Sequence, residues 1–478
     1  MSRPFFAFSF QKQSDIPLYL QLSAQLRKAI SLGAFLQNGD QLVSLREMKT
    51  ISGCSLETVK KAYDHLVAEG DLEAVHGKGY FVTPRLLREP VVLGDVPLFS
   101  ALDSTPAPTA ELVRRLRQHF LSSFEILGED RSQATRRRQQ AKDLIIAHEK
   151  KRGVPLTAER VLLFNRSRSG LAFLVSHLMK PGDVVYLEEY TYPPLLAIMQ
   201  SRGVIVRLIP FDDEGISLDL LKAAHETEPA DWLLIQPHHH FPTGLSYSRK
   251  RKLALLAWAE ETDVSIIEND HHGDLWFQRP SRTLYRIVNE EQRNVSVYYI
   301  HSFSKTLSRE LMLGLLALPV TLDEAEVTRL SQLVSLHSLE PSLLVIEAVS
   351  HILCDPWLSE QFLPERRAHL AAQWQMVKQA ADQLLPSHAR LYPVKGGLNT
   401  WIHWGEPTIH ADQIEERVVT ILRAEGIEIA PGYTFGMPSE AHNRNARIPA
   451  LRFPLSPWGP REMLHWLSRI AAILGQYT

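Results

Sequence analysis

The chain has 478 residues, of which 45% are hydrophobic and 22% charged, and its formal net charge at pH 7 is −2. This length exceeds what one hydrophobic core usually supports, and the composition is that of a folded protein without long disordered segments, so we expect a small and a large domain. The near-zero net charge excludes a strong overall field for nucleic acid, and any DNA binding must therefore come from a local basic surface.

The N-terminal region predicts three helices followed by a hairpin. Residues 17–32 place leucines at helical spacing after a proline suited to a first turn. Ser44 opens a capping box for a second helix that stops at Gly53, and Ser55 caps a third helix that runs to about residue 69. Residues 72–82 then form two short strands around a glycine-rich turn. The pattern is that of a winged helix-turn-helix.

In such a domain, the start of the last helix enters the major groove, while a wing or the preceding helix contacts phosphate. Spacing alone is equally compatible with a generic three-helix domain that has a solvated basic edge. In the DNA-binding interpretation, the polar and cationic residues at the expected contact positions are Ser44, Arg46, Ser55, Thr58, Lys60, Lys61 and Lys78.

The next region predicts a linker and then an α/β domain. Residues 83–108 are rich in proline and lack periodicity. Beyond them, strand-like runs alternate with helical stretches, which indicates a mostly parallel sheet with helices on both faces. These runs are residues 160–164, 184–187, 204–209, 232–235, 264–267 and 295–300.

After residue 322 helices dominate, and residues 398–403 and 450–455 resemble strands of a smaller α+β lobe. We place the DNA-binding domain at residues 1–84, the linker at 85–109 and the second domain at 110–478. Within that domain the large lobe covers about 110–345 and the C-terminal lobe 346–478.

Three segments of the second domain have the features of a pyridoxal phosphate site. Residues 165–170 follow a strand and open a helix, where Ser167 and backbone amides suit a phosphate, although a plain N-cap loop has the same pattern. Tyr192 is suited to stack on a ring, although such a tyrosine is often core. Residues 302–305 follow a hydrophobic strand and end in Lys305, which alone would be a surface lysine. Together they supply a phosphate cradle, an aromatic ring and a reactive amine.

The N-terminal region resembles the winged-helix domain of the GntR superfamily over residues 16–84. The likeness rests on PLYLQL, LVSLREMKTISGCSLETVKKAYDHLVAEG and HGKGYFV. It implies binding to a double-stranded DNA operator. Many relatives have an arginine directly after the serine that opens the recognition helix, and this chain has Leu56, so base preference is not carried over.

The rest of the chain resembles fold-type I aminotransferases, and the fusion resembles the MocR (GabR-like) regulators. The matching stretches include LLFNRSRSGL, GDVVYLEEYTYP, SIIENDHHGDL, YYIHSFSKTLS and ALRFPL. The resemblance implies pyridoxal 5'-phosphate as cofactor and Lys305 as the aldimine lysine. It also implies phosphate ligands Ser167, Ser302 and Ser304, a stacking ring Tyr192, ring-oxygen contact by His239 or His240, and effector-carboxylate binding by Arg452.

The chain departs from that pattern within the site itself. Asn269 stands where the family has the aspartate that pairs with the pyridine nitrogen, and His271 where a tyrosine often meets the ring hydroxyl. Met312 replaces a phosphate-binding arginine, for which Arg166 and Arg168 are the nearest substitutes. The usual glycine-rich segment is replaced by residues 130–138.

Three functions follow from these patterns. The favoured one is a homodimeric transcription regulator whose large domain senses an amino compound or the cofactor. The alternatives are a working aminotransferase and a regulator whose large domain is a cofactor-free dimerisation scaffold. Because Asn269 is neutral, we expect no useful turnover of amino acids.

The remaining signals concern location. Cys54 and Cys354 are too few for a disulfide framework or a CxxC metal site, so we expect a reducing cytoplasm and no metal. The N-terminus lacks a long apolar segment, and the apolar residues 311–320 are too few to span a bilayer. We therefore expect no membrane partner.

Overall fold

The computed structural model describes residues 10, 17–31, 36–37, 41–75, 77–83, 104–436, 447–456 and 458–476. The chain divides into two compact units. The first comprises residues 1–95 and 438–444, and the second comprises residues 96–437 and 445–478.

The first unit contains α1 (Leu18–Ser31), α2 (Leu45–Ser52) and α3 (Leu56–Ala68). An antiparallel sheet has the order β1 (Leu36–Gln37), β2 (Gln41–Leu42), β4 (Gly79–Val82) and β3 (Leu72–Val75). The predicted N-caps are confirmed, since the side chains of Ser44 and Ser55 accept hydrogen bonds from the backbones of Glu47 and Thr58. Gly53 ends α2 in the left-handed conformation, with φ of 72°.

This unit has its own core, in which the inward faces of α1, α2 and α3 meet. Buried residues at helical spacing, such as Leu22 and Leu26 of α1 and Val59 and Leu66 of α3, contact one another there. The hydroxyl of the buried Tyr63 donates to the Val43 carbonyl at 2.9 Å, which joins α3 to the segment before α2. His76, at the tip of the predicted hairpin, lies outside the described residues.

The large lobe of the second unit is built on a sheet with the strand order β5-β13-β12-β11-β10-β6-β7 over residues 104–436. The strands are β5 (Val161–Phe164), β6 (Val184–Glu188), β7 (Ile205–Ile209), β10 (Trp232–Ile235), β11 (Ser265–Asn269), β12 (Val297–Ser302) and β13 (Gly314–Ala317). Neighbours from β7 to β12 are parallel, whereas β13 is antiparallel to β12 and β5. The sheet is therefore mostly parallel, as predicted, with β13 as an inserted antiparallel strand.

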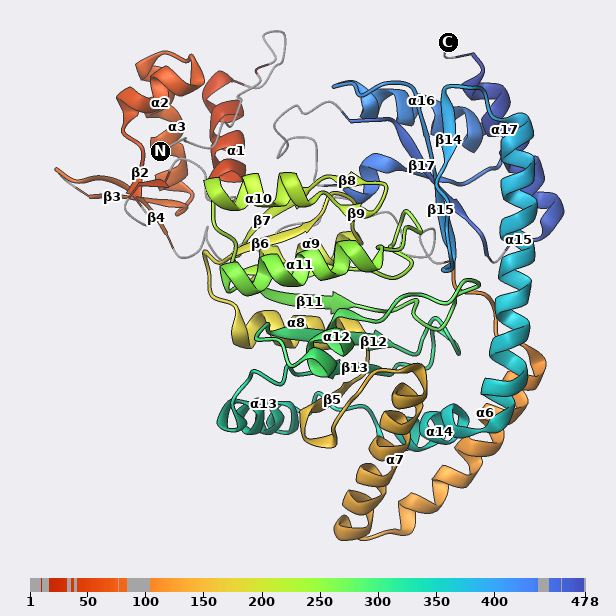
Figure 1. Ribbon diagram of the computed structural model, residues 1–478. Helices are drawn as coiled ribbons and strands as arrows, with labels where there is room; N and C mark the ends of the chain where they lie inside the picture. Colours follow the sequence, from red (N-terminus) through yellow and green to blue (C-terminus); the bar gives the residue numbers. More distant parts are fainter. Residues whose placement is uncertain are drawn as a thin grey trace. The chain divides into compact units, whose positions relative to one another are not determined.

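Helices cover both faces of this sheet (Figure 1). Alternate residues of β5 show the division: Val161 and Leu163 pack on one face, and Leu162 and Phe164 on the other. The first face is covered by α6 (Ala110–Ser123), α7 (Arg131–Arg152), α10 (Leu218–Thr227), α11 (Arg249–Thr262), α12 (Leu284–Glu291) and α14 (Leu343–Cys354). The second is covered by α8 (Ser167–Leu178), α9 (Pro193–Ser201) and α13 (Glu324–Leu336).

The small lobe carries an antiparallel sheet of order β14-β15-β17-β16, which includes both strands predicted near residues 400 and 452. Its strands are β14 (Ala389–Leu391), β15 (Asn399–Trp404), β16 (Ala430–Pro431) and β17 (Ala450–Pro454). Its helices are α15 (Leu363–Leu384), α16 (Ala411–Ala424) and α17 (Pro460–Leu474), and the long α15 runs from beside the large lobe to α17 (Figure 1).

Among the described residues, no helix combines the length and apolar character needed to cross a membrane. The same residues contain no group of three or more histidine, cysteine or acidic side chains arranged to hold a metal ion.

Candidate functional site

A cavity of about 430 Å³ in the second unit brings together most of the residues predicted to bind the cofactor. It lies where β11 and β12 end and α8 begins. Its lining includes the predicted residues Ser167, Arg168, Tyr192, Asn269, His271, Ser302, Ser304 and Lys305. It also includes Arg166, which the sequence offered with Arg168 as a substitute phosphate ligand. The lining residues that the sequence did not single out are Leu171, Leu195, Leu234, Phe241, Ile300, Arg309 and Glu310.

Lys305 reaches the cavity from the turn after β12. Ser302 and Ser304 line the cavity, whereas Phe303 between them is fully buried in the core on the other side of the sheet. This alternation fixes the orientation of the segment that carries the lysine. The Lys305 amine donates to the hydroxyl oxygen of Thr105 at 2.7 Å. Thr105 belongs to the segment just before α6, which the sequence indicated only as linker.

The start of α8 forms the polar end of the cavity. Arg166 is the N-cap residue and no side chain caps the helix, so the first turn presents backbone amides at the positive end of the helix dipole. Close packing supports this turn, because a Cβ atom at Gly314 of β13 would overlap the backbone nitrogen of Ser167. The arrangement of amides, Ser167 and Arg168 suits a phosphate group. Met312, which stands where the family has a phosphate-binding arginine, does not line the cavity. The nearby Arg309 lines it instead.

Aromatic and amide groups line the middle of the cavity. The Tyr192 ring packs edge-on against Phe241, with centroids 5.7 Å apart, and its hydroxyl lies 3.5 Å from an Arg168 nitrogen. The His271 imidazole is neutral in character, because burial and the neighbouring His272 and Lys305 hold its pKa well below the usual value. Asn269, the last residue of β11, presents an uncharged amide.

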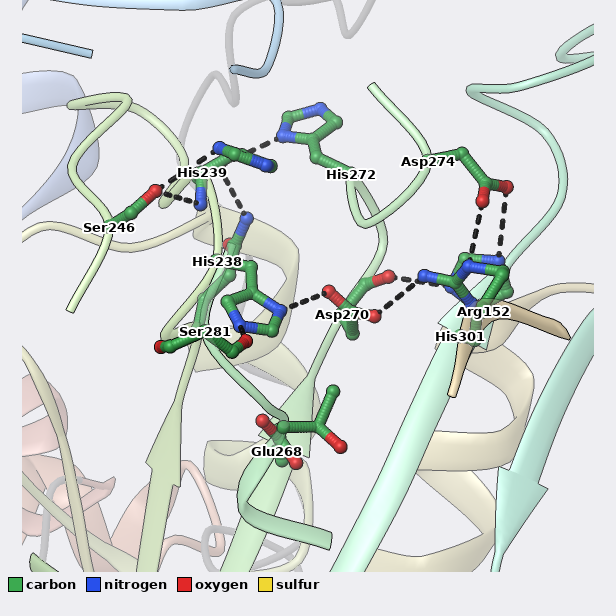
Figure 2. Close-up of polar contacts among 12 residues, drawn as sticks. Arg152, His238, His239, Ser246, Glu268, Asp270, His272, Asp274, Ser281 and His301 are labelled. Carbon is green, nitrogen blue, oxygen red and sulfur yellow. Dashed lines mark hydrogen bonds and ion pairs between the residues drawn. The ribbon is translucent and has the colours of Figure 1, made fainter. Parts of the chain in front are cut away.

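Asp270 does not replace the missing aspartate at position 269. Its carboxylate does not line the cavity that Asn269 lines, and it accepts hydrogen bonds from Arg152 at 2.9 Å and His238 at 3.1 Å (Figure 2). It also accepts one from the Tyr299 hydroxyl at 2.8 Å. Burial opposes its ionisation, but the hydrogen bond from His238 and the charges of His238 and Arg152 outweigh burial and hold the Asp270 pKa well below its usual range. The carboxylate is therefore committed to the opposite face of the strand.

The two histidines suggested for the ring-oxygen side lie elsewhere. The His239 imidazole contacts the Ser246 hydroxyl at 3.1 Å and packs against Gly396 and Gly397. The buried His240 contacts the Thr243 hydroxyl at 2.9 Å and lies 3.1 Å from the Glu188 carboxylate. Neither lines the cavity in the described part of the chain, where Phe241 contributes instead. A loop after β10, in which His239 has a positive φ of 49°, sets the directions of these imidazoles and turns both into the protein.

Arg452 of β17 lies beside the cavity rather than in its lining. It is buried, and one of its terminal nitrogens donates to the Ser104 hydroxyl at 2.9 Å and to the Asn399 side-chain oxygen at 3.0 Å. Its guanidinium carbon lies 5.7 Å from the centroid of the Phe241 ring. Ser104 and Thr105 thus connect Arg452 to Lys305. The sequence gave no signal for these two residues, because proline-rich segments lack periodicity.

In the first unit, the predicted DNA contacts fall into two groups. Ser44, Ser55 and Thr58 participate in helix capping, with the Ser55 and Thr58 hydroxyls 2.8 Å apart. The cationic side chains are exposed at the surface: Arg46 on α2, Lys60 and Lys61 on α3 and Lys78 in the β3–β4 turn. Lys61 pairs with Glu57 at 2.9 Å, an exposed contact that a phosphate can replace.

Comparison with known proteins identifies the two parts of the chain. The sequence matches the family Aminotransferase class I and II over residues 127–449 and the family of bacterial regulatory proteins, gntR family, over residues 18–82. It is 23% identical over 461 residues to the HTH-type transcriptional regulator YisV of Bacillus subtilis, covering 89% of this chain and 90% of that one. It is 26% identical over 400 residues to the probable rhizopine catabolism regulatory protein MocR of Rhizobium meliloti, covering 76% and 77%.

Among solved structures, the chain is similar to LysN, an α-aminoadipate aminotransferase from Thermus thermophilus, with a TM-score of 0.64. The sequence identity is 20%, and the match covers 79% of this chain and 94% of LysN. This likeness establishes the fold-type I aminotransferase architecture of the second unit.

Proposed function

The chain belongs to the aminotransferase class I and II family and joins that domain to a gntR-family helix-turn-helix domain, as MocR-type regulators do; on this premise we propose a transcription regulator that binds pyridoxal phosphate and responds to a small amino compound. The observation that carries the proposal is the position of Lys305. Its amine lies in a cavity with a helix start suited to a phosphate, and it is hydrogen-bonded to Thr105 in the predicted linker.

The residues of the cavity fit pyridoxal phosphate. The volume of about 430 Å³ falls in the range of small-molecule sites, roughly 300–1,000 Å³. The start of α8 with Ser167 would hold the phosphate, Tyr192 would contact the ring, and the Asn269 amide would hydrogen-bond the ring nitrogen. When bound, the cofactor supplies an aldehyde that exchanges between the Lys305 amine and an incoming amine.

Arg452 supports an effector that carries a carboxylate. A guanidinium binds a carboxylate through paired hydrogen bonds, which are stronger than its present bonds to the hydroxyl of Ser104 and the amide of Asn399. An amino acid-like effector at Lys305 and Arg452 would therefore compete with Thr105 and Ser104 for the same donors. Ser104 and Thr105 belong to the predicted linker, residues 85–109, and we therefore propose that this competition passes the ligand state to the DNA-binding domain.

Asn269 favours sensing over turnover. Transamination requires a ring nitrogen that remains protonated while negative charge develops, and a paired carboxylate provides this. Asn269 is neutral, and Asp270 is held by Arg152, Tyr299 and His238 on the other face of the strand. Exchange of amines does not need the carboxylate, so ligand binding is retained where catalysis is weak.

Titration of the full-length protein with pyridoxal phosphate tests the cofactor site. We expect visible absorbance from the lysine-bound cofactor, and borohydride reduction followed by peptide mass spectrometry should place the label on Lys305. Lys305→Ala should abolish both signals, whereas Lys222→Ala, which changes an exposed lysine on α10, should leave them unchanged. Absence of cofactor binding in the unmodified protein would favour the dimerisation-scaffold alternative.

Operator binding by Arg46→Ala tests the DNA-binding surface. We expect weaker binding, with the slope of log K against log salt reduced by about one unit if Arg46 contacts a phosphate. Arg417→Ala, at an exposed site on α16 of the second unit, is the matched control. Equal binding by both variants and the unmodified protein would exclude Arg46 from the interface.

We further propose a homodimer, because two winged helices match a two-half-site operator and fold-type I sites are commonly completed by a second subunit. Sedimentation at micromolar concentration should give twice the mass of one chain. A protein that is monomeric there and still binds its operator would refute this part of the proposal.

A further inference from the structure

A second cavity, of about 490 Å³, lies behind the strand that carries Asn269. Asn269 lines the first cavity and its neighbour Asp270 lines the second, because consecutive residues at a strand end point to opposite sides. The walls of the second cavity come from the end of α7, the segment 270–286 and the start of α15. None of its lining residues belongs to the lining of the cofactor cavity.

The lining of this cavity is strongly cationic. It contains Lys151, Arg152, Arg249, Arg279, Arg282, Arg286 and Arg367, against the carboxylates of Asp270 and Asp274. Arg152 pairs with both of these carboxylates, at 2.9 and 2.7 Å, as Figure 2 shows. Arg152 also pairs with the buried Glu149 at 2.6 Å, so this cluster holds more carboxylates than cations, and any excess positive charge of the lining comes from the other residues.

The other cations are only partly compensated. Arg282 and Arg286 share one carboxylate, Glu290, at 2.6 and 2.7 Å. Lys151, Arg249 and Arg279 are exposed and form no ion pair with any residue that the structure describes. The cavity therefore keeps an excess of positive charge.

Arg367 gives an independent indication of an anionic ligand. Its Nε donates to the Asp274 backbone carbonyl at 2.9 Å, and its guanidinium carbon lies 4.0 Å from the centroid of the Trp276 ring. Burial lowers the Arg367 pKa more than the nearby Asp274 raises it, so the cation lacks a full counter-charge. A partly buried cation is costly unless it is paired, and an anion in the cavity would pair it.

Two glycines lie where arginine side chains approach the backbone at this cavity. Gly153 ends α7 with φ of 94°, and a Cβ atom there would overlap the guanidinium of Arg286. A Cβ atom at Gly273 would overlap the guanidinium of Arg152 and the carboxylate of Asp270. The two glycines therefore allow arginines to approach the backbone around one cavity.

We propose that the second cavity is a binding site for a small phosphate-bearing polyanion, separate from the cofactor site. A tetrahedral phosphate accepts hydrogen bonds from several directions, which suits cations spread around a cavity, whereas one carboxylate engages a single guanidinium fork. The site is independent of the proposed function of Lys305. A phosphorylated metabolite and free inorganic phosphates share this chemistry.

Calorimetric titration of the full-length protein with sodium pyrophosphate tests this site. We expect binding that weakens with added salt and that falls at least tenfold in the double variant Arg249→Ala/Arg279→Ala. Both residues are exposed and form no ion pair with the residues that the structure describes, so the thermal stability of the variant without pyrophosphate should be unchanged. Arg417→Ala on α16 controls for a general loss of positive charge.

A second variant separates this site from the phosphate cradle of the first cavity. Ser167→Ala/Arg168→Ala should retain the binding event that Arg249→Ala/Arg279→Ala loses. The proposal is overturned if Arg249→Ala/Arg279→Ala binds pyrophosphate as the unmodified protein does, or if only the Ser167→Ala/Arg168→Ala variant loses the binding heat. It is also overturned if Arg417→Ala loses as much binding heat as Arg249→Ala/Arg279→Ala. Loss of pyridoxal phosphate absorbance with retained pyrophosphate binding would overturn the proposed function and leave this site intact.

Parallel titrations distinguish the sources of the anion. Glucose 6-phosphate represents a phosphorylated metabolite, and orthophosphate represents the free ion. Tighter binding of the ester supports a metabolite site, and tighter binding of orthophosphate supports an inorganic phosphate site. A short non-operator DNA duplex that displaces pyrophosphate would instead make this surface part of the DNA-binding face and would contradict the proposal.

Discussion

Strands β11 and β12 present uncharged side chains to the first cavity on one face and buried ionisable side chains on the other. The cavity face carries Asn269 and Ser302, followed by Lys305. The opposite face carries Glu268 and Asp270 from the end of β11 and His301 from β12, with Arg152 of α7 reaching Asp270 and Asp274 (Figure 2). Consecutive residues at the end of β11 therefore face different surroundings: Asn269 lines the first cavity, and Asp270 belongs to the buried ion-pair network.

This comparison explains why the nearby carboxylate of Asp270 does not line the first cavity. Asp270 is ionised, buried and saturated with hydrogen bonds, and moving it would leave Arg152 and His238 without their partner. The hydrogen bonds that hold the Asp270 carboxylate against Arg152 and His238 also keep it out of the first cavity. The cavity face is left with the neutral side chains of Asn269 and Ser302.

The largest effect should come from removing the central cation of the charged face. In Arg152→Ala, the buried carboxylates of Glu149, Asp270 and Asp274 lose their shared cation, and we expect a loss of about 3–5 kcal/mol in unfolding free energy. Scanning calorimetry of the transition of the second unit is the measurement. Arg329→Ala, which removes an exposed pair with Glu326, should cost no more than about 1 kcal/mol. Similar losses in the two variants would show that the network is not central to stability.

The charged face should also make the second unit sensitive to acid. The Asp270 pKa is depressed in the folded state, so its contribution to stability is fully present above the unfolded value of about 3.9 and is lost as the pH falls through the folded value. At pH values below about 4, we expect the melting temperature of the protein to decrease. In Asp270→Asn, which is less stable at neutral pH, this acid dependence should be smaller. An unchanged pH profile in that variant would assign the acid sensitivity to other groups.

On the cavity face, Asn269→Asp tests whether a carboxylate there restores chemistry. We expect amino acid turnover by the unmodified protein well below about 1 s⁻¹, and at least a tenfold rise in Asn269→Asp. The assay follows keto-acid product with a panel of amino acids and added cofactor. Turnover at ordinary enzyme rates by the unmodified protein would show that Asn269 does not limit catalysis.

A smaller effect is expected from the segment that contacts the same cavity. Thr105→Ala removes the hydroxyl that accepts from Lys305, and Ser104→Ala removes the one that accepts from Arg452. Each of these hydrogen bonds contributes about 0.5–1.5 kcal/mol. Because the variants no longer occupy the Lys305 or Arg452 donor, a ligand that uses that donor should bind the variant about 2- to 10-fold more tightly than the unmodified protein. Thr105→Ala should raise cofactor affinity, measured by absorbance titration. Ser122→Ala on α6 is the control, because its hydroxyl bonds only within the helix. Weaker cofactor binding in Thr105→Ala would show that Thr105 supports the site rather than competing for it.

Local signals in the sequence determined much of the architecture. The capping box at Ser44 and the cap at Ser55 depend on neighbours within three residues, so the first unit was readable without tertiary information. Strands β5 and β10 of the large lobe are continuous apolar runs, because both faces of the sheet are covered by helices. Strand β13 was missed, since its short apolar run was considered only as a possible membrane segment. Lys305 and Ser167 were located by resemblance, and the structure places them in one cavity.

Only the tertiary structure decided which side chains face that cavity. The sequence could not show that His239 and His240 turn inward, because a tight loop rather than a regular strand sets their directions. It gave no sign that Ser104 and Thr105 reach Lys305 and Arg452, which are hundreds of residues away in the chain. The second cavity likewise gathers cations from segments that are distant in sequence. Helix caps and apolar periodicity are local properties of the chain, whereas a site depends on contacts that exist only after the elements have packed.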